Sequence, residues 1–154
     1  MTLEEAKQEV IANRDEGITC PCCGQLAKVY KRLVYGSMAV DLIRLYQKHM
    51  FDDDWNKYYH ISKVRTVTAG GGDFAKFVYW GLVEEQQKDP DDLSKRTSGF
   101  WRITNIGKAF VEKKTQIMKY VIIYDSNVLR FEGDLVDIES CLRGKFNYQE
   151  LMNR

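Results

Sequence analysis

The segment over residues 72–114 constrains the fold more than any other part of the sequence, because residues that start and end helices occur in it at regular points. Asp73 is placed to cap a helix that has Phe74 and Phe77 on one apolar face. Gly81 follows and suits the left-handed residue at which a helix ends. The pattern predicts a helix between Asp73 and Gly81.

Two strands and a second helix follow in the same segment. Residues 82–85 and 99–103 have the character of strands, and the polar stretch 86–98 between them is typical of a loop. Thr104 is a natural N-cap for a helix over 105–114. The order helix, strand, loop, strand, helix is therefore expected here.

Hydrophobic periodicity and turn signals predict the remaining elements. They are a helix over 3–14, a tight turn over 18–24, a strand or extended arm over 26–34, a helix from an N-cap at Ser37 to about Met50, an extended or short helical stretch over 55–68, a hairpin with strands 120–124 and 128–131, a short helix over 136–142 and a last helix from Asn147. The expected fold class is α+β. We expect one compact unit with three parts, residues 1–35, a core over 36–118 and an appendage over 119–154.

The composition is that of a globular protein that folds without disulfides. The chain has 154 residues, 44% of them apolar and 29% charged, and a chain of this length buries roughly two thirds of its unfolded surface. No stretch approaches the roughly 20 apolar residues of a membrane span. The acidic start, Met1–Glu5, lacks the basic and apolar regions of a signal peptide. We therefore expect a cytoplasmic protein with no membrane partner.

The net charge of +1 is unevenly distributed. Residues 1–16 carry two bases and five acids, and residues 125–154 carry four bases and six acids. Residues 17–124 therefore carry 17 bases against 11 acids, a net charge of +6. A basic middle between acidic ends is compatible with a nucleic-acid-binding face, and equally with a mixed, solvated surface.

The run Cys20-Pro21-Cys22-Cys23-Gly24 is the strongest short motif. Cys20 and Cys23 have C-x₂-C spacing, and with Pro21 and Gly24 they complete the knuckle found in zinc ribbons. Two thiolates from one turn can bind one tetrahedral ion, because backbone amides in that turn stabilise the sulfur charges. A structural zinc site needs four ligands, so this motif predicts half of one.

The ligands that would complete the zinc site are open. The candidates are Cys22, His49, His60, Cys141 or a symmetric partner chain. We favour His60, because His49 falls on the apolar stripe of its predicted helix and is expected to be a core histidine. The alternatives are a reduced knuckle without metal or buried thiols that pack as small apolar groups. A redox role is disfavoured, since the βαβ setting of thioredoxin-like proteins is missing.

The segment 73–110 resembles the reading head of winged-helix proteins. Asp73–Glu84 looks like the end of a recognition helix followed by the Gly-Leu-Val-Glu start of a wing. Gly99–Phe110 resembles the second wing strand and the next helix, with the pattern aromatic-Arg-Ile-Thr-x-x-Gly-x-x-Phe of many bacterial winged-helix regulators. The resemblance covers roughly 36–114. The whole chain also resembles phage and prophage proteins that combine a Cys-Pro-x-Cys-Gly turn with such a segment, a group that supplies no function.

The resemblance implies binding to double-stranded DNA. In a helix-turn-helix the recognition helix lies in the major groove, and the wing contacts the backbone or the minor groove. The candidate contacts are Lys76 and Tyr79 on the helix, Lys95, Arg96 and Arg102 on the wing, and Lys63 and Arg65 upstream. The expected role is transcriptional regulation or phage DNA metabolism.

Two departures favour a second interpretation, in which the fold binds or inhibits a host protein. The wing carries Asp89, Asp91 and Asp92, which would repel phosphate. Lys76 is the only base of the recognition helix, which has no Arg or Asn placed for base readout. A homodimer formed by the N-terminal helix or by residues 120–154 is also expected. An enzyme is not expected, because no nucleophile motif or metalloprotease motif is present and the chain has only two histidines.

Overall fold

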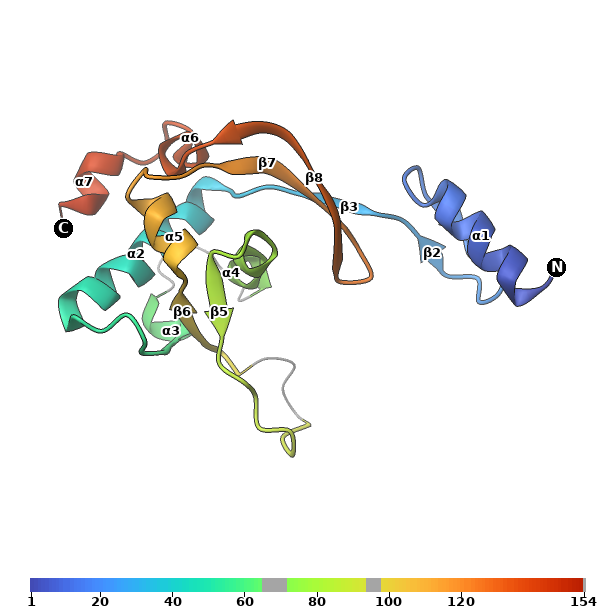
Figure 1. Ribbon diagram of the computed structural model, residues 1–154, viewed down its shortest axis with the longest axis horizontal. Coiled ribbons are helices and arrows are strands. Elements are labelled where there is room, and N and C mark those ends of the chain that lie inside the picture. The colour runs from blue at the N-terminus through green and yellow to red at the C-terminus, as the bar shows by residue number, and fades with distance from the viewer. Residues whose placement is uncertain (65–71, 94–97, 154) are drawn as a thin grey trace. The chain divides into compact units, whose positions relative to one another are not determined.

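A computed structural model describes residues 1–64, 72–93 and 98–153, and it is a mixed α+β structure with antiparallel sheets (Figure 1). The α+β class predicted from the sequence is confirmed. The chain divides into two compact units, one made of Met1–Leu33 and Tyr120–Gly133, the other of Val34–Lys119 and Asp134–Arg154. Among the helices described, none has the length and apolar character that crossing a membrane requires.

The first unit combines a capped helix with a small hairpin. Its elements are α1 (Leu3–Asn13), β1 (Ile18–Thr19), β2 (Leu26–Ala27) and β3 (Tyr30–Arg32). Thr2 starts α1 with a capping box, in which its hydroxyl accepts from the Glu5 amide at 3.1 Å and the Glu5 carboxylate accepts from the Thr2 amide at 3.3 Å. The strands β1 and β2 pair antiparallel and hold the cysteine turn between them.

A second hairpin completes the three-stranded sheet β3-β7-β8. It is formed by β7 (Ile117–Tyr124) and β8 (Asn127–Val136), which are longer than the strands predicted at this position. The turn residues Asp125 and Ser126 have φ of 51° and 62°. Two successive left-handed residues form a turn whose twist matches that of the flanking strands. The hairpin predicted around Asp125-Ser126-Asn127 is therefore present.

The second unit is built around α2 (Gly36–Asp52), of which ten residues are buried. Five of the described helices pack against it, namely α3 (Ile61–Val64), α4 (Gly72–Ala75), α5 (Asn105–Val111), α6 (Ile138–Leu142) and α7 (Tyr148–Met152). The prediction that Ser37 is the N-cap is wrong. The N-cap is Tyr35, and its side chain makes no capping hydrogen bond. A Cβ on Gly36 would lie 3.2 Å from the Leu142 carbonyl oxygen, so the start of α2 packs closely against the end of α6.

The sheet of the second unit has the order β4-β6-β5 and is antiparallel. Its strands are β4 (Tyr59–His60), β5 (Val83–Glu85) and β6 (Phe100–Ile103), and α3 (Ile61–Val64) follows β4 directly. The helix predicted between Asp73 and Gly81 is one α-helical turn, α4, followed by the 3₁₀ helix η1 (Lys76–Trp80). Gly81 ends it at φ 73°, as the sequence predicted.

The close approach of α5 to the strand β5 depends on Gly107. Thr104 caps α5 by accepting from the Gly107 amide at 3.0 Å, as predicted. A Cβ on Gly107 would lie 2.0 Å from the carbonyl oxygen of Leu82, which is a backbone atom that cannot rotate away. Only glycine therefore fits at this crossing.

We expect Gly107→Ala to lower the free energy of unfolding by about 3 kcal/mol or more, because the added methyl group forces α5 away from β5. Urea denaturation measures the change. Ile106→Ala is the matched control on the same helix, since Ile106 is 54% exposed and its truncation should cost no more than about 0.5 kcal/mol. Equal stabilities of Gly107→Ala and wild type would contradict the packing described.

The buried His49 joins three segments of the second unit. Its Nδ1 donates to the Asp54 carbonyl oxygen at 2.8 Å, and its Nε2 accepts from the Ile103 amide of β6 at 3.1 Å. The ring stacks on Trp55 at 5.4 Å and meets the edge of Tyr59 at 5.0 Å. Burial lowers the pKa of His49, against a smaller opposing effect of the Asp54 carbonyl. The ring is therefore a neutral core histidine, which agrees with the sequence interpretation.

We expect acid to destabilise the protein through His49. Above about pH 6.5 neither state protonates this ring. As the pH falls below that value the unfolded state takes up the proton first, so the free energy of unfolding falls by up to about 1.4 kcal/mol per pH unit until the lower folded pKa is reached. Urea denaturation between about pH 7 and pH 5 measures the slope. His49→Gln should reduce this slope, and an unchanged slope in His49→Gln would exclude this source.

Candidate functional site

The described part of the predicted DNA-contact set occupies α3, η1 and β6. Lys63 is exposed on α3, Lys76 is the first residue of η1, Tyr79 is half-buried near its end, and Arg102 lies on β6. The other predicted contacts, Arg65, Lys95 and Arg96, lie outside the described residues.

Two of these cations are paired with carboxylates. Lys76 Nζ lies 2.8 Å from Asp73 Oδ1, which is one turn earlier in the same helical segment. Arg102 Nη2 lies 2.7 Å from Glu84 Oε2, because the register of β5 and β6 places these residues opposite each other. The hydrogen bond that Arg102 donates to the Glu84 carboxylate raises the pKa of Arg102. Pairs as exposed as these contribute about 1 kcal/mol or less to stability, but each neutralises a charge that DNA would otherwise meet.

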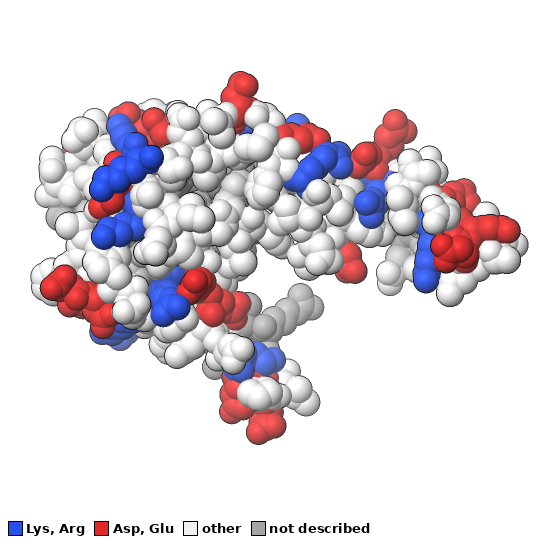
Figure 2. Space-filling view, in the orientation of Figure 1, with Lys and Arg blue, Asp and Glu red and all other residues white. Residues whose placement is uncertain are grey.

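The surface in view carries charges of both signs. Figure 2 shows basic and acidic side chains interspersed over the second unit, with acidic side chains at the end of the loop that follows β5. That loop carries Asp89, Asp91 and Asp92. The face shown has no continuous basic stripe.

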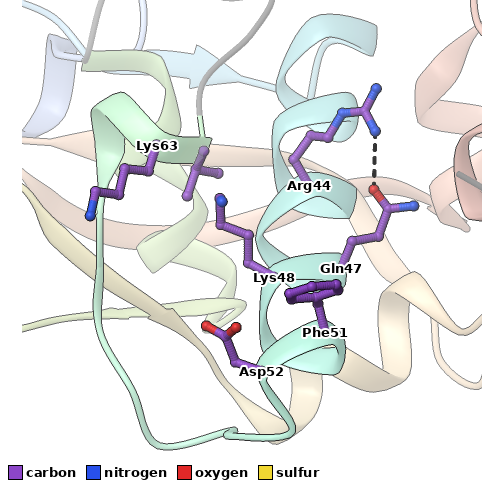
Figure 3. Close-up of a pocket in the computed structure, with 7 residues that line it drawn as sticks. Arg44, Gln47, Lys48, Phe51, Asp52 and Lys63 are labelled. Carbon is purple, nitrogen blue, oxygen red and sulfur yellow. Dashed lines mark hydrogen bonds between the residues drawn. The ribbon is translucent and has the colours of Figure 1, made fainter.

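The structure places two basic residues that the sequence analysis did not single out, Arg44 and Lys48, at one pocket with Lys63. A pocket of about 350 Å³ lies between α2 and α3, with Lys63 at its edge (Figure 3). It is lined by Arg44, Gln47, Lys48, Phe51, Asp52, Lys63 and Val64. Arg44 and Lys48 are one turn apart on α2, so their spacing of four residues was the available signal.

Three basic residues and one acidic residue line this pocket. Arg44 Nη1 donates to Gln47 Oε1 at 3.1 Å, which holds the guanidinium in place. The carboxylate of Asp52 is engaged by the Tyr59 hydroxyl at 2.6 Å, which lowers the pKa of Asp52, and by Lys57 at 3.5 Å. The Phe51 ring beside them is 91% exposed. Cations next to an exposed aromatic ring can contact phosphate and stack on a base or a partner side chain.

The cysteine motif folds as a knuckle between β1 and β2. The Cys20 amide donates to the Gln25 carbonyl at 2.7 Å, the Gly24 amide donates to the Cys20 carbonyl at 3.0 Å, and Gly24 has φ 75°. The backbone amides of Cys23 and Cys22 donate to the sulfur of Cys20, and with the Cys23 thiol they lower the pKa of Cys20. This turn favours a thiolate at Cys20 with Cys23 in contact with it.

The other candidate ligands have structural roles in the second unit. Burial raises the pKa of Cys141 to about 11, and both ring nitrogens of His49 are hydrogen-bonded. His60 Nδ1 lies 2.8 Å from the Ser62 hydroxyl, and a Cβ on Gly99 would lie 3.0 Å from its Nε2. Among the described residues, no group of three or more His, Cys, Asp or Glu side chains could hold a metal ion. The predicted set Cys20, Cys23 and His60 spans the two units and stays a prediction.

Comparison with family models, with curated proteins and with solved structures finds no match for this chain. Its function is therefore inferred from its own topology and side chains.

We expect three of the four thiols of the reduced, metal-free protein to react rapidly with Ellman's reagent. Cys22 and Cys23 are exposed and Cys20 is half-buried with a lowered pKa, whereas Cys141 is buried with a raised one. The fourth thiol should react only in denaturant. Cys141→Ala is the control, because it should leave the native count at three and reduce the denatured count from four to three. Four fast native thiols would contradict the burial of Cys141.

Proposed function

We propose that this chain is a small DNA-binding protein of winged-helix type that grips duplex DNA through its second unit. The observation that carries the proposal is the order of elements α2, β4, α3, α4 with η1, β5 and β6, together with the sheet order β4-β6-β5. A helix-turn-helix followed by a hairpin has this order, and the residues that resemble winged-helix proteins fall on the same elements. The turn between α3 and α4 lies outside the described residues.

Phosphate contacts would supply the affinity. Lys63 contributes together with Arg44 and Lys48 of the adjacent pocket, and Lys76, Tyr79 and Arg102 act from η1 and β6, with Arg65, Lys95 and Arg96 in support. Because Lys76 and Arg102 already have carboxylate partners, we expect weak binding with little sequence preference. Regulation of transcription or phage DNA metabolism in a host cytoplasm fits such a protein.

We infer within the same proposal that the knuckle holds a structural zinc ion through Cys20 and Cys23. Thiolates in a turn whose amides point at sulfur are the donors that zinc prefers in structural sites. The knuckle would then gain stability from the metal, since binding free energy at a structural site is also folding free energy. His60 is the further ligand that the sequence favoured.

A second candidate function is a protein-interaction module that binds or inhibits a host protein. The ion pairs Asp73–Lys76 and Glu84–Arg102 favour it, because they neutralise the face that would meet DNA. The exposed Phe51 ring would also suit a protein partner.

Fluorescence anisotropy with a mixed-sequence duplex at 50 mM and 200 mM salt tests the leading proposal. We expect micromolar binding that weakens about tenfold or more over this range, because each phosphate contact contributes about −0.9 to the slope of log K against log salt. Lys48→Ala with Lys63→Ala should weaken binding and reduce that slope by about 2.

Lys7→Ala with Lys28→Ala is the matched control, since it removes the same charge from the first unit. It should leave the slope nearly unchanged. An equal loss in both double variants would mean that binding depends only on net charge. No binding at 50 mM salt would exclude the DNA proposal and leave the protein-interaction module, for which a host-lysate pull-down with Phe51→Ala as comparison is the next experiment.

A further inference from the structure

The first unit has two converging thiols at the knuckle and few other donors that zinc prefers. Its cysteines are Cys20, Cys22 and Cys23, and it contains no histidine, because both histidines and Cys141 belong to the second unit. Cys20 and Cys23 line one pocket together with Leu26, and Cys22 does not line it. Structural zinc takes four nitrogen or sulfur ligands, so one knuckle supplies two of them.

The nitrogen and sulfur donors of the second unit are committed to its own structure. Cys141 is 5% exposed in the core. Both ring nitrogens of His49 are hydrogen-bonded, one to the Asp54 carbonyl oxygen and the other to the Ile103 amide of β6. The Nδ1 of His60 accepts from the Ser62 amide at 3.2 Å. A metal that recruited Cys141 or His49 would cost the second unit contacts that it now has, and a metal at Nδ1 of His60 would compete with Ser62.

An exposed apolar surface lies beside the knuckle. Leu3 and Ile11 of α1 are 61% and 52% exposed, and Leu26 of β2 is 69% exposed. A pocket of about 360 Å³ separates α1 from the knuckle. It is lined by Leu3, Ala6, Lys7, Val10, Ile11, Arg14, Cys20, Cys22 and Tyr124. Leu3 and Ile11 line this pocket with Cys20, and Leu26 lines a second pocket with Cys20 and Cys23, so one partner could cover apolar side chains and complete the ligand set together.

We propose that two copies of this chain share one zinc ion, to which each copy contributes Cys20 and Cys23. A two-fold axis through the metal would bring the same surface of both copies together and cover the apolar side chains around each knuckle. On binding, four thiols release their protons to solvent and four zinc–sulfur bonds form, without any change in oxidation state. The inference rests on the zinc ion of the proposed function and adds the second copy.

Zinc content and molar mass, measured on the same sample of full-length protein, test this inference. The protein is purified without chelator, saturated with zinc, desalted, and analysed by metal mass spectrometry and by light scattering coupled to gel filtration. We expect one zinc ion for two chains and twice the mass of the 18.0 kDa chain. A strong chelator should return the 18.0 kDa species. Cobalt in place of zinc should give the spectrum of a tetrahedral site with four thiolates.

Four variants assign the ligands. Cys20→Ser and Cys23→Ser should each abolish both the metal and the dimer. Cys22→Ser and His60→Ala are the matched controls, and both should keep the stoichiometry of one zinc ion for two chains. Circular dichroism and the thermal transition of the second unit show whether each variant remains folded. A cobalt spectrum that Cys22→Ser alters would place Cys22 among the ligands and overturn the assignment.

The remaining outcomes separate this inference from the proposed function. One zinc ion per monomeric chain, lost in His60→Ala, would overturn the shared site and support the ligand set that the sequence favoured. Protein that binds less than a tenth of an equivalent of zinc would overturn both the shared site and the structural zinc. The dimer could also persist in chelator and in Cys20→Ser. This result would overturn the inference, because the two copies would then associate without the metal.

Discussion

The imidazole of His49 is the interaction on which the second unit depends most directly. His49 lies on α2. Its ring hydrogen-bonds to the Asp54 carbonyl in the loop after that helix and to the Ile103 amide of β6. A neutral ring is required, because one nitrogen must donate while the other accepts. The ring thereby fixes β6 against α2, and β6 in turn is the strand that pairs with both β4 and β5. The helices α3 and α4, on either side of the undescribed turn, pack against α2.

The sequence predicted those elements whose ends are set by local chemistry. Thr104 caps α5, Asn147 caps α7, and Gly81 ends the segment before β5, all as expected. These signals work because a cap or a left-handed glycine acts within four residues of itself. The predicted N-cap at Ser37 was wrong, because the residue before α2 is Tyr35, whose side chain makes no capping hydrogen bond. Gly36, which lies against the Leu142 carbonyl, begins the helix instead, and a contact over such a distance along the chain leaves no local pattern.

The candidate site was harder to predict because its charges depend on register and on distant contacts. Glu84 and Arg102 pair across β5 and β6, whose connecting loop is too long to fix the register from the sequence. The pocket of Arg44, Lys48 and Lys63 needs the placement of α3 beside α2. The cysteine knuckle, by contrast, could be predicted as a turn, since all its hydrogen bonds join residues within five positions. Its missing ligands could not, because no spacing in the sequence assigns them.

The proposed DNA binding and the proposed zinc-linked pair of chains are connected, because a pair of chains has two units that could bind DNA. If the second unit binds DNA as proposed, the pairing of Lys76 with Asp73 and of Arg102 with Glu84 would reduce its net phosphate contacts, so one copy alone would bind weakly. Two chains joined by the proposed shared zinc ion would offer two such units to one duplex, and the second unit would then bind at an effective concentration rather than from bulk solution. Affinity would rise by orders of magnitude without a new contact, provided that both faces reach the DNA together. Zinc would then control DNA binding from a unit that need not touch the DNA, because removing the metal separates the pair and leaves each face at its weak single-copy affinity.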